Sequence, residues 1–255
     1  MTTKVRYLSE DEIEKEAELL LAEYAETTGN PTKMPVPVDE IVTYHLALRL
    51  GFADLHETLR IPMLRDQPDI LGAIWVDKEA ILIDRSLDPK RSPSMAGRYR
   101  FSVAHEIGHW RLHRTYVGKD ANQASLFDGS PEPTVICRSS QAKEPIEWQA
   151  DFFSSCLLMP RRRVHEEWKE RLGRTRPLLL SDLRPNGRVM MRAQTKIYEQ
   201  GRSETGAVDD ALFEDIAKPI ARCFDVSAPA MRIRLERLGL LLRDAPRQTS
   251  LRVSP

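Results

Sequence analysis

The sequence has few cysteines, no net charge and no long apolar run, and each shortage excludes a class of protein. Its three cysteines are scattered and lack C-x-x-C spacing, so we expect neither a disulfide framework nor a thiolate zinc cage. Lysine plus arginine and aspartate plus glutamate both total 38, so no overall field draws the chain onto nucleic acid or an anionic membrane. The scattered cysteines indicate a protein of the reducing cell interior.

The chain also has no stretch suited to a signal peptide or a membrane span. Its first residues, MTTKVRYLSEDEIEKE, become acidic where a signal peptide needs an apolar core. No later segment approaches the roughly 18 apolar residues of a spanning helix. We therefore expect a cytoplasmic protein with no membrane partner. Its 255 residues suffice for one substantial core, or for a core domain plus a smaller appendage.

Helical periodicity and turn residues predict a mixed fold. Ser9 and Glu12 form a capping-box pattern before a helix over about residues 10–27, and Asp39 can cap a second helix over EIVTYHLALRL. Two short apolar segments, LGAIWV and AILIDR, flank a turn and predict two antiparallel strands. Further helices are expected over Arg98 to about Arg114, Ile146 to LLMP, RVHEEWKERL, DALFEDIAKPIARCF and APAMRIRLERLGLLL.

The stretch RFSVAHEIGHWRLHR places three histidines at intervals of four residues. His105 and His109 lie on one face of the predicted helix, about 6 Å apart along its axis, so both rings can reach one zinc ion. His113 lies about 12 Å from His105 along that axis, and zinc–nitrogen bonds are only about 2 Å long. We therefore predict two histidine ligands, and a structural or substrate-side role for His113.

Glu106 follows the first of these histidines, and its carboxylate is expected on the adjoining side of the helix. Zinc lowers the pKa of a bound water toward neutrality, and a carboxylate placed there takes its proton as the hydroxide attacks a carbonyl. Glu106 is therefore the predicted general base. A chance H-E-x-x-H on a surface helix is the competing interpretation. The apolar FSVA segment, and Gly108, which permits a close backbone approach, argue against it.

A catalytic zinc needs a third protein ligand, and the segment EPIEWQADFFSSCLLMP offers the best candidates. Glu147 and Asp151 are four residues apart and share one face of the predicted helix. We assign Glu147 as the third ligand. Asp151 is the predicted acceptor for the free ring N–H of one histidine, which fixes the orientation of that ring. The competing interpretation is that both acids only cap or solvate the helix.

Three segments, GAIWVDKEAILIDRSL, FSVAHEIGHWRLHR and EWQADFFSSCLLMP, together resemble the ImmA/IrrE family of zinc metallopeptidases over roughly residues 36–165. The resemblance implies an α+β fold with a thermolysin-like, gluzincin-like core. In such a core a small antiparallel sheet packs on the HEXXH helix and on a second, ligand-bearing helix. The resemblance places the metal ligands on His105, His109 and Glu147, and the base on Glu106.

The same resemblance implies a function and a partner. Family members characteristically cut a repressor that carries a helix-turn-helix, which switches on phage-like, mobile-element or stress genes. We therefore expect a site-specific endopeptidase with one Zn²⁺ per chain, for which Mn²⁺ or another divalent cation could substitute. The family's common Glu-Ala-Asn appears here as Gln149-Ala150-Asp151, which leaves Glu147 as the acid at the ligand position. A strand within residues 71–84 is expected to pair with the extended substrate along an exposed edge.

The expected peptidase domain spans residues 1–170, and a helical extension with a flexible tail at 244–255 spans residues 171–255. Its segment IARCFDVSAPAMRIRLERLGL resembles a helix-turn-helix that would present three arginines to DNA: Arg232, Arg234 and Arg237. Packing on the peptidase is the favoured interpretation, because the chain has no basic excess. The rival functions are a DNA-binding regulator with an inert or structural zinc, and a metallohydrolase of a small molecule.

Overall fold

The computed structural model describes residues 6–62, 69–116, 133–138, 144–201 and 203–244. The chain separates into two compact units, residues 1–160 and 161–255. The boundary along the chain lies ten residues before the end expected for the peptidase domain. Nearly all of the expected tail lies outside the described residues. Among the helices that are described, none combines the length and the apolar character needed to cross a bilayer.

The N-terminal unit is built on a four-stranded sheet with the strand order β1-β3-β2-β4. Its strands are β1 (Arg49–Ala53), β2 (Ile70–Trp75), β3 (Ala80–Asp84) and β4 (Val135–Arg138). The predicted antiparallel pairing of β2 with β3 is confirmed, and β4 also pairs antiparallel with β2. β1 pairs parallel with β3. The α+β fold class is confirmed, with one parallel edge added to the expected antiparallel sheet.

β1 replaces the end of a predicted helix. α2 (Val38–Glu40) and a π-helical turn (Ile41–His45) cover the first part of the EIVTYHLALRL segment. Ala47 then has a φ of 55°, in the left-handed region, and the chain turns there. Arg49 begins the pairing with β3 two residues later. The prediction of one continuous helix was wrong because it used local periodicity, while the partner strand is distant in the sequence.

β2 and β3 both lie inside the sheet. β3 has β1 and β2 as neighbours, and β2 has β3 and β4. The expectation that a strand within residues 71–84 offers an exposed edge to the substrate is therefore wrong. In the part of the chain that the structure describes, the outer strands are β1 and β4.

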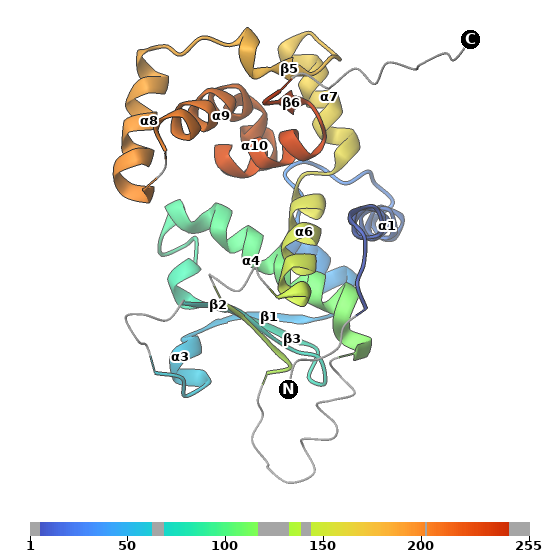
Figure 1. The fold of residues 1–255 in the computed structure, drawn as a ribbon. Coiled ribbons are helices and arrows are strands. Elements are labelled where there is room, and N and C mark those ends of the chain that lie inside the picture. The colour runs from blue at the N-terminus through green and yellow to red at the C-terminus, as the bar shows by residue number, and fades with distance from the viewer. Residues whose placement is uncertain (1–5, 63–68, 117–132, 139–143, 202, 245–255) are drawn as a thin grey trace, which may run out of the picture. The chain divides into compact units, whose positions relative to one another are not determined.

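Helices cover both faces of this sheet (Figure 1). α4 (Ala96–Gly108) and α3 (Leu55–Thr58) both pack on β2 and β3. Gly72 of β2 faces Glu106 of α4, and the next residue, Ala73, packs in the cluster around Leu55 of α3. Because successive strand residues point to opposite faces, α4 and α3 lie on opposite sides of the sheet.

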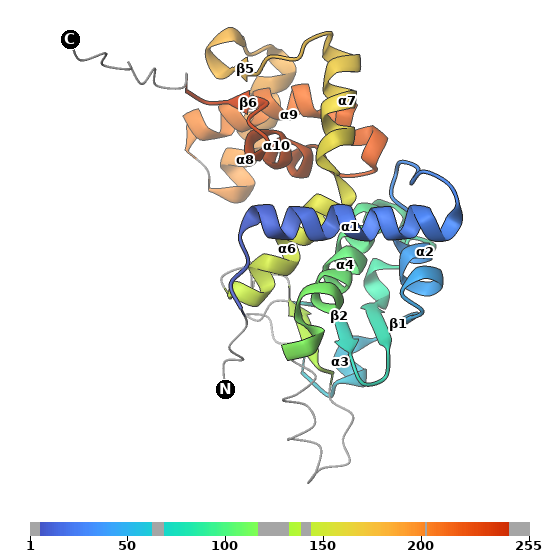
Figure 2. The same cartoon turned by 90° about the vertical axis from the view of Figure 1, so that its right-hand side faces the viewer.

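Two further helices complete the N-terminal unit. α6 (Pro145–Leu158) packs beside α4, and α1 (Glu10–Thr28) packs along α6 (Figure 2). The predicted capping box of α1 is confirmed, since the Ser9 hydroxyl accepts from the amide of Glu12 and the Glu12 carboxylate accepts from the amide of Ser9. The α4–α6 pair therefore sits between the sheet and α1.

The C-terminal unit is mainly helical. It contains α7 (Arg161–Leu172), α8 (Gly187–Gln200), α9 (Glu204–Phe224), α10 (Ala228–Arg237) and the short parallel strands β5 (Leu178–Leu179) and β6 (Leu241–Leu242). α9 packs against both α8 and α10. α8 was not expected from the sequence, although Asn186 caps it and Val189, Ala193 and Ile197 place an apolar stripe on one face.

Candidate metal centre

α4 and α6 bring two histidines and a glutamate together. His105 comes from the last turn of α4, His109 begins a π-helical turn (His109–His113) that continues it, and Glu147 lies in the first turn of α6. His105 Nε2 lies 2.8 Å from His109 Nε2 and 3.1 Å from Glu147 Oε2. His109 Nε2 lies 3.5 Å from Glu147 Oε1. One ligand atom from each residue lies within 4.8 Å of the others, so this group could hold a metal ion.

The donor set fits a divalent cation. Two imidazole nitrogens 2.8 Å apart cannot both direct lone pairs at each other unless a proton or a cation lies with them. All three side chains are buried, and two histidines with one glutamate form a ligand set found at catalytic zinc sites. Although burial raises it, hydrogen bonds with His105 and His109 lower the pKa of Glu147 to about 2. Glu147 is therefore anionic at neutral pH, as a metal ligand of this type needs to be.

The outer nitrogen of each histidine also has a partner. His105 Nδ1 lies 2.9 Å from Asp151 Oδ1, the contact assigned to Asp151 from the sequence. His109 Nδ1 lies 3.0 Å from His113 Nδ1, and His113 Nε2 lies 3.3 Å from Gln149 Oε1. Burial, together with the neighbouring His109, lowers the pKa of His113 to about 3, so this ring is neutral.

His113 therefore contacts His109 on its Nδ1 side, away from the Nε2 atom that approaches His105. It has no exposed surface, which suits the structural role expected for it and does not suit a residue that touches substrate. The sequence reasoning missed Gln149 as its partner. The interval of four residues between His109 and His113 was a visible signal for the first contact, whereas the second joins two different helices.

Glu106 is completely buried next to His105. Within the described residues, neither carboxyl oxygen has a hydrogen-bond partner. Burial raises the pKa of Glu106 to about 8, and the Glu147 charge acts in the same direction. In the metal-free chain this carboxyl is thus held neutral near pH 7, and a nearby cation would favour its charged form. A buried acid with two unused oxygens costs stability, which fits a residue retained for chemistry.

The turn that carries His109 and His113 is anchored to α1. Arg111 donates from Nε to Glu16 at 2.8 Å and from a terminal nitrogen to Glu23 at 2.7 Å. Its side chain is largely buried between these acids, so two charge-assisted contacts hold the outside of the turn. α1 therefore supports this turn from the side away from the sheet.

Residues 79–178 match the Peptidase_M78 family model, which is described as the IrrE N-terminal-like domain. This segment is therefore similar to the IrrE N-terminal-like domain. The match confirms the resemblance predicted from the sequence and includes His105, Glu106, His109 and Glu147. The match supports a peptidase-family assignment. The group of His105, His109 and Glu147, which could bind a metal ion, is compatible with that assignment. A search of curated proteins finds no match to the chain.

Gly108 lies where α4 and α6 approach each other closely. An alanine Cβ there would lie 3.1 Å from Ala150 Cα and 3.3 Å from Ala150 O, which are backbone atoms of α6. We expect Gly108→Ala to force α4 and α6 apart, lowering the free energy of unfolding by about 1–3 kcal/mol and weakening metal binding. Chemical unfolding and a chelator competition measure the two effects.

Gly97→Ala is the matched control on the same helix. An alanine Cβ at Gly97 meets nothing within 4 Å, so we expect stability to rise by up to about 1 kcal/mol with unchanged metal affinity. Equal behaviour of the two variants would contradict the close approach at Gly108.

Gly72 of β2 leaves the space that the Glu106 carboxyl group occupies. An alanine Cβ at Gly72 would lie 2.5 Å from Glu106 Oε1. We expect Gly72→Ala to displace that carboxyl and to lower kcat/KM for peptide hydrolysis by about 100-fold, the cost of a misplacement of about 1 Å. The metal-to-protein ratio should not change. Gly51→Ala in β1, whose Cβ would meet only a side-chain carbon of Leu82 at 3.2 Å, is the control, and an equal loss there would refute the steric explanation.

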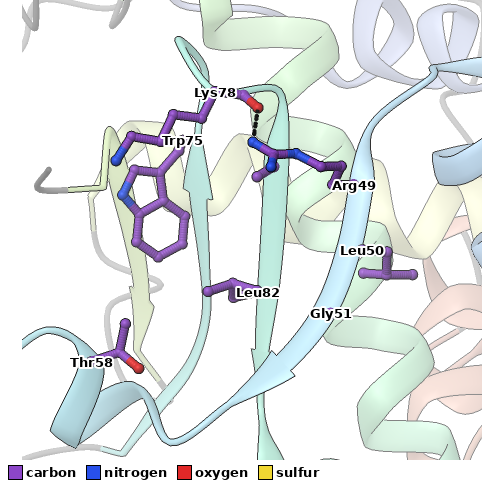
Figure 3. A pocket seen from close by; sticks show the side chains of 8 residues that line it. Arg49, Leu50, Gly51, Thr58, Trp75, Lys78 and Leu82 are labelled. Carbon is purple, nitrogen blue, oxygen red and sulfur yellow. Dashed lines mark hydrogen bonds between the residues drawn. The ribbon is translucent and has the colours of Figure 1, made fainter.

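A hollow of about 440 Å³ lies on the α3 side of the sheet (Figure 3). It is lined by Arg49, Leu50, Gly51, Thr58, Trp75, Lys78, Ala80 and Leu82. The Arg49 guanidinium donates to the carbonyl oxygen of Lys78 at 2.9 Å. These lining residues include no histidine and no acid, so the hollow is separate from the predicted metal ligands.

The last two helices lie beyond the IrrE N-terminal-like match. α9 and α10 are joined by a short turn, as expected for a helix-turn-helix-like segment. Arg232 is buried and contacts three acids, Asp210 and Glu214 at 3.4 Å and Glu236 at 2.5 Å. Arg234 is 1% exposed, whereas Arg237 is exposed. Two of the three arginines considered for DNA contact are therefore buried inside the C-terminal unit, which argues against a DNA-binding surface built on them.

Proposed function

We propose that this chain is a cytoplasmic, zinc-dependent endopeptidase that cuts a helix-turn-helix transcriptional repressor. The observation that carries the proposal is the convergence of two imidazole nitrogens and one carboxylate, with a buried glutamate directly beside them. The match to an IrrE N-terminal-like domain supports the peptidase class. The repressor as substrate is supported by the family resemblance, and the reducing interior by the scattered cysteines.

Each side chain has a defined task in this reaction. When bound, a zinc ion polarises the scissile carbonyl and lowers the pKa of a water at the site. His105 and His109 offer Nε2, and Glu147 offers a carboxylate oxygen, to hold it. Glu106 accepts the proton of the attacking water at its carboxylate and returns it to the leaving nitrogen as the C–N bond breaks. One water is consumed, and a new carboxyl and a new amino terminus are produced.

Among the strands that the structure describes, the outer strand nearest to Glu106 is suited to pair with the substrate. β4 is the outer neighbour of β2, the strand whose Gly72 contacts Glu106. An extended peptide that adds to β4 gains main-chain hydrogen bonds without displacing a strand. We expect amide hydrogen exchange in β4 to slow when an inactive Glu106→Gln chain binds the repressor. Unchanged exchange in β4 would exclude this binding mode.

The experiment that tests the proposal uses the full chain loaded with Zn²⁺ and helix-turn-helix repressors, beginning with those encoded beside its gene. New termini are located by mass spectrometry. We expect a single cut in one repressor, which disappears when a chelator removes the metal. Hydrolysis of small amides with no cut repressor would favour a small-molecule hydrolase. Sequence-specific DNA binding without any hydrolysis would favour the regulator.

A further inference from the structure

We propose that His113 and Gln149 are positioning residues that fix which nitrogen of His109 is free to bind the metal. The inference rests on the proposed metallopeptidase function and deepens it. Four groups follow one another as a hydrogen-bonded relay: the carbonyl of Arg6, the side-chain amide of Gln149, the ring of His113 and the ring of His109. We call this set the Gln149 relay.

The direction of the Gln149 relay is set at its outer end. Gln149 Nε2 lies 3.1 Å from the carbonyl oxygen of Arg6, and a carbonyl oxygen can only accept. The amide nitrogen therefore points toward Arg6, and the amide oxygen faces His113 Nε2 at 3.3 Å. Because that oxygen also can only accept, the N–H of His113 is on Nε2.

The proton on His113 then determines the proton on His109. A neutral imidazole carries one N–H, so His113 Nδ1 has a lone pair and must accept. It faces His109 Nδ1 at 3.0 Å, and His109 therefore donates from Nδ1. The lone pair of His109 is left on Nε2, the atom that lies 2.8 Å from His105 Nε2 and 3.5 Å from Glu147 Oε1. The opposite tautomer would place a proton where the metal binds.

The two histidine ligands are held by unlike partners. Asp151 is a carboxylate that accepts from His105 Nδ1, whereas His109 is held by a neutral ring and a neutral amide. An amide at position 149 can donate to Arg6 and accept from His113 at the same time. A carboxylate there would face the Arg6 carbonyl oxygen without a hydrogen to donate. This double role explains why glutamine suits position 149 in this chain.

The tautomers can be observed directly. In the ¹⁵N-labelled, Zn²⁺-loaded full chain, two-bond ¹H–¹⁵N spectra of the histidine rings should show His113 protonated on Nε2. They should show His109 protonated on Nδ1, with its Nε2 shifted by the metal. The exposed His165, assigned with a His165→Ala variant, gives the reference pattern of a free ring. Protonation of His113 on Nδ1, or metal bound through His109 Nδ1, would overturn the proposal.

Two substitutions of His113 separate positioning from packing. His113→Asn keeps an acceptor near the place of Nδ1, and His113→Leu fills a similar volume without one. For Zn²⁺, measured by chelator competition, we expect the leucine variant to bind about 10- to 100-fold more weakly, as is typical when an outer partner is lost. The asparagine variant should stay close to wild type. Equal losses in both variants, or none in either, would overturn the proposal.

Gln149→Met tests the relay at its other contact. Without the amide oxygen, His113 is free to take the other tautomer, so we expect weaker Zn²⁺ binding and mixed His113 protonation in the ring spectra. Wild-type affinity with unmixed tautomers in Gln149→Met would count against the relay. These readouts need no peptide substrate. A chain that cuts no repressor but shows the expected tautomers would therefore refute the proposed function alone.

Discussion

Glu106→Gln should abolish peptide hydrolysis while leaving the metal in place. Glutamine has the shape of the buried carboxyl but cannot take a proton from water at neutral pH. General-base catalysis typically contributes about 10²- to 10⁴-fold, so kcat/KM for repressor cleavage should fall by at least that range. Termini mapped by mass spectrometry over a time course measure the loss.

The folded state should tolerate this substitution. The Glu106 oxygens have no hydrogen-bond partner among the described residues, so a neutral amide replaces a group that contributes little to stability. We expect the thermal midpoint of the metal-free variant to equal or exceed that of wild type, and the zinc-to-protein ratio to be unchanged. If the variant retained more than about a tenth of the activity, the loss would be less than about 10-fold. A loss that small lies below the range for a general base and would rule out Glu106 in this role.

His109→Ala should remove the metal itself. His109 supplies one of the three converging atoms that could bind the metal. Loss of a residue that only hydrogen-bonds to a metal ligand typically weakens binding by roughly 10- to 100-fold, so loss of His109 itself should weaken Zn²⁺ binding by more. A ligand present at 1,000 times its Kd stabilises the folded state by about 4 kcal/mol. Zn²⁺ should therefore raise the thermal midpoint of the wild-type chain and leave that of His109→Ala unchanged.

Metal analysis of the dialysed proteins gives the second readout. We expect one zinc per wild-type chain and almost none in His109→Ala. His165→Ala is the matched control, because His165 is exposed and lies outside the predicted centre. A wild-type chain that binds no zinc, or a His109→Ala chain that binds it as well as wild type, would refute the assignment of this ligand.

Short-range spacing was sufficient to predict the inner part of the site. His105 and Glu106 lie on α4, and His109 lies in the π-helical turn that continues it. Glu147 and Asp151 share one face of α6, so intervals of one and four residues determine the relative positions within each group. Spacing along the chain does not predict the contact between the two helices. That contact was expected from the chemical need for a third ligand, and the structure brings Glu147 within reach of both histidines.

What spacing did not show depends on distant contacts. The Gln149 relay links three segments that are distant in the sequence: the N-terminal segment at Arg6, α6, and the turn that carries His113. The contact of Gly72 with Glu106 likewise brings together a strand and a helix. β1 was missed because its pairing with β3 outweighs the helical pattern of its neighbours. Arg232 suited a DNA-binding surface in the sequence, but acids from α9 surround it. In each case a tertiary neighbour decided the result.

Anomalous diffraction at the zinc absorption edge, from crystals of the Zn²⁺-loaded chain, tests the metal centre most directly. We predict one strong peak per chain, within about 2 Å of Nε2 of His105, Nε2 of His109 and a carboxylate oxygen of Glu147. Glu106 should lie close to the ion without coordinating it. A peak elsewhere, or a peak ligated by Glu106 in place of Glu147, would contradict the assignment of ligands and base.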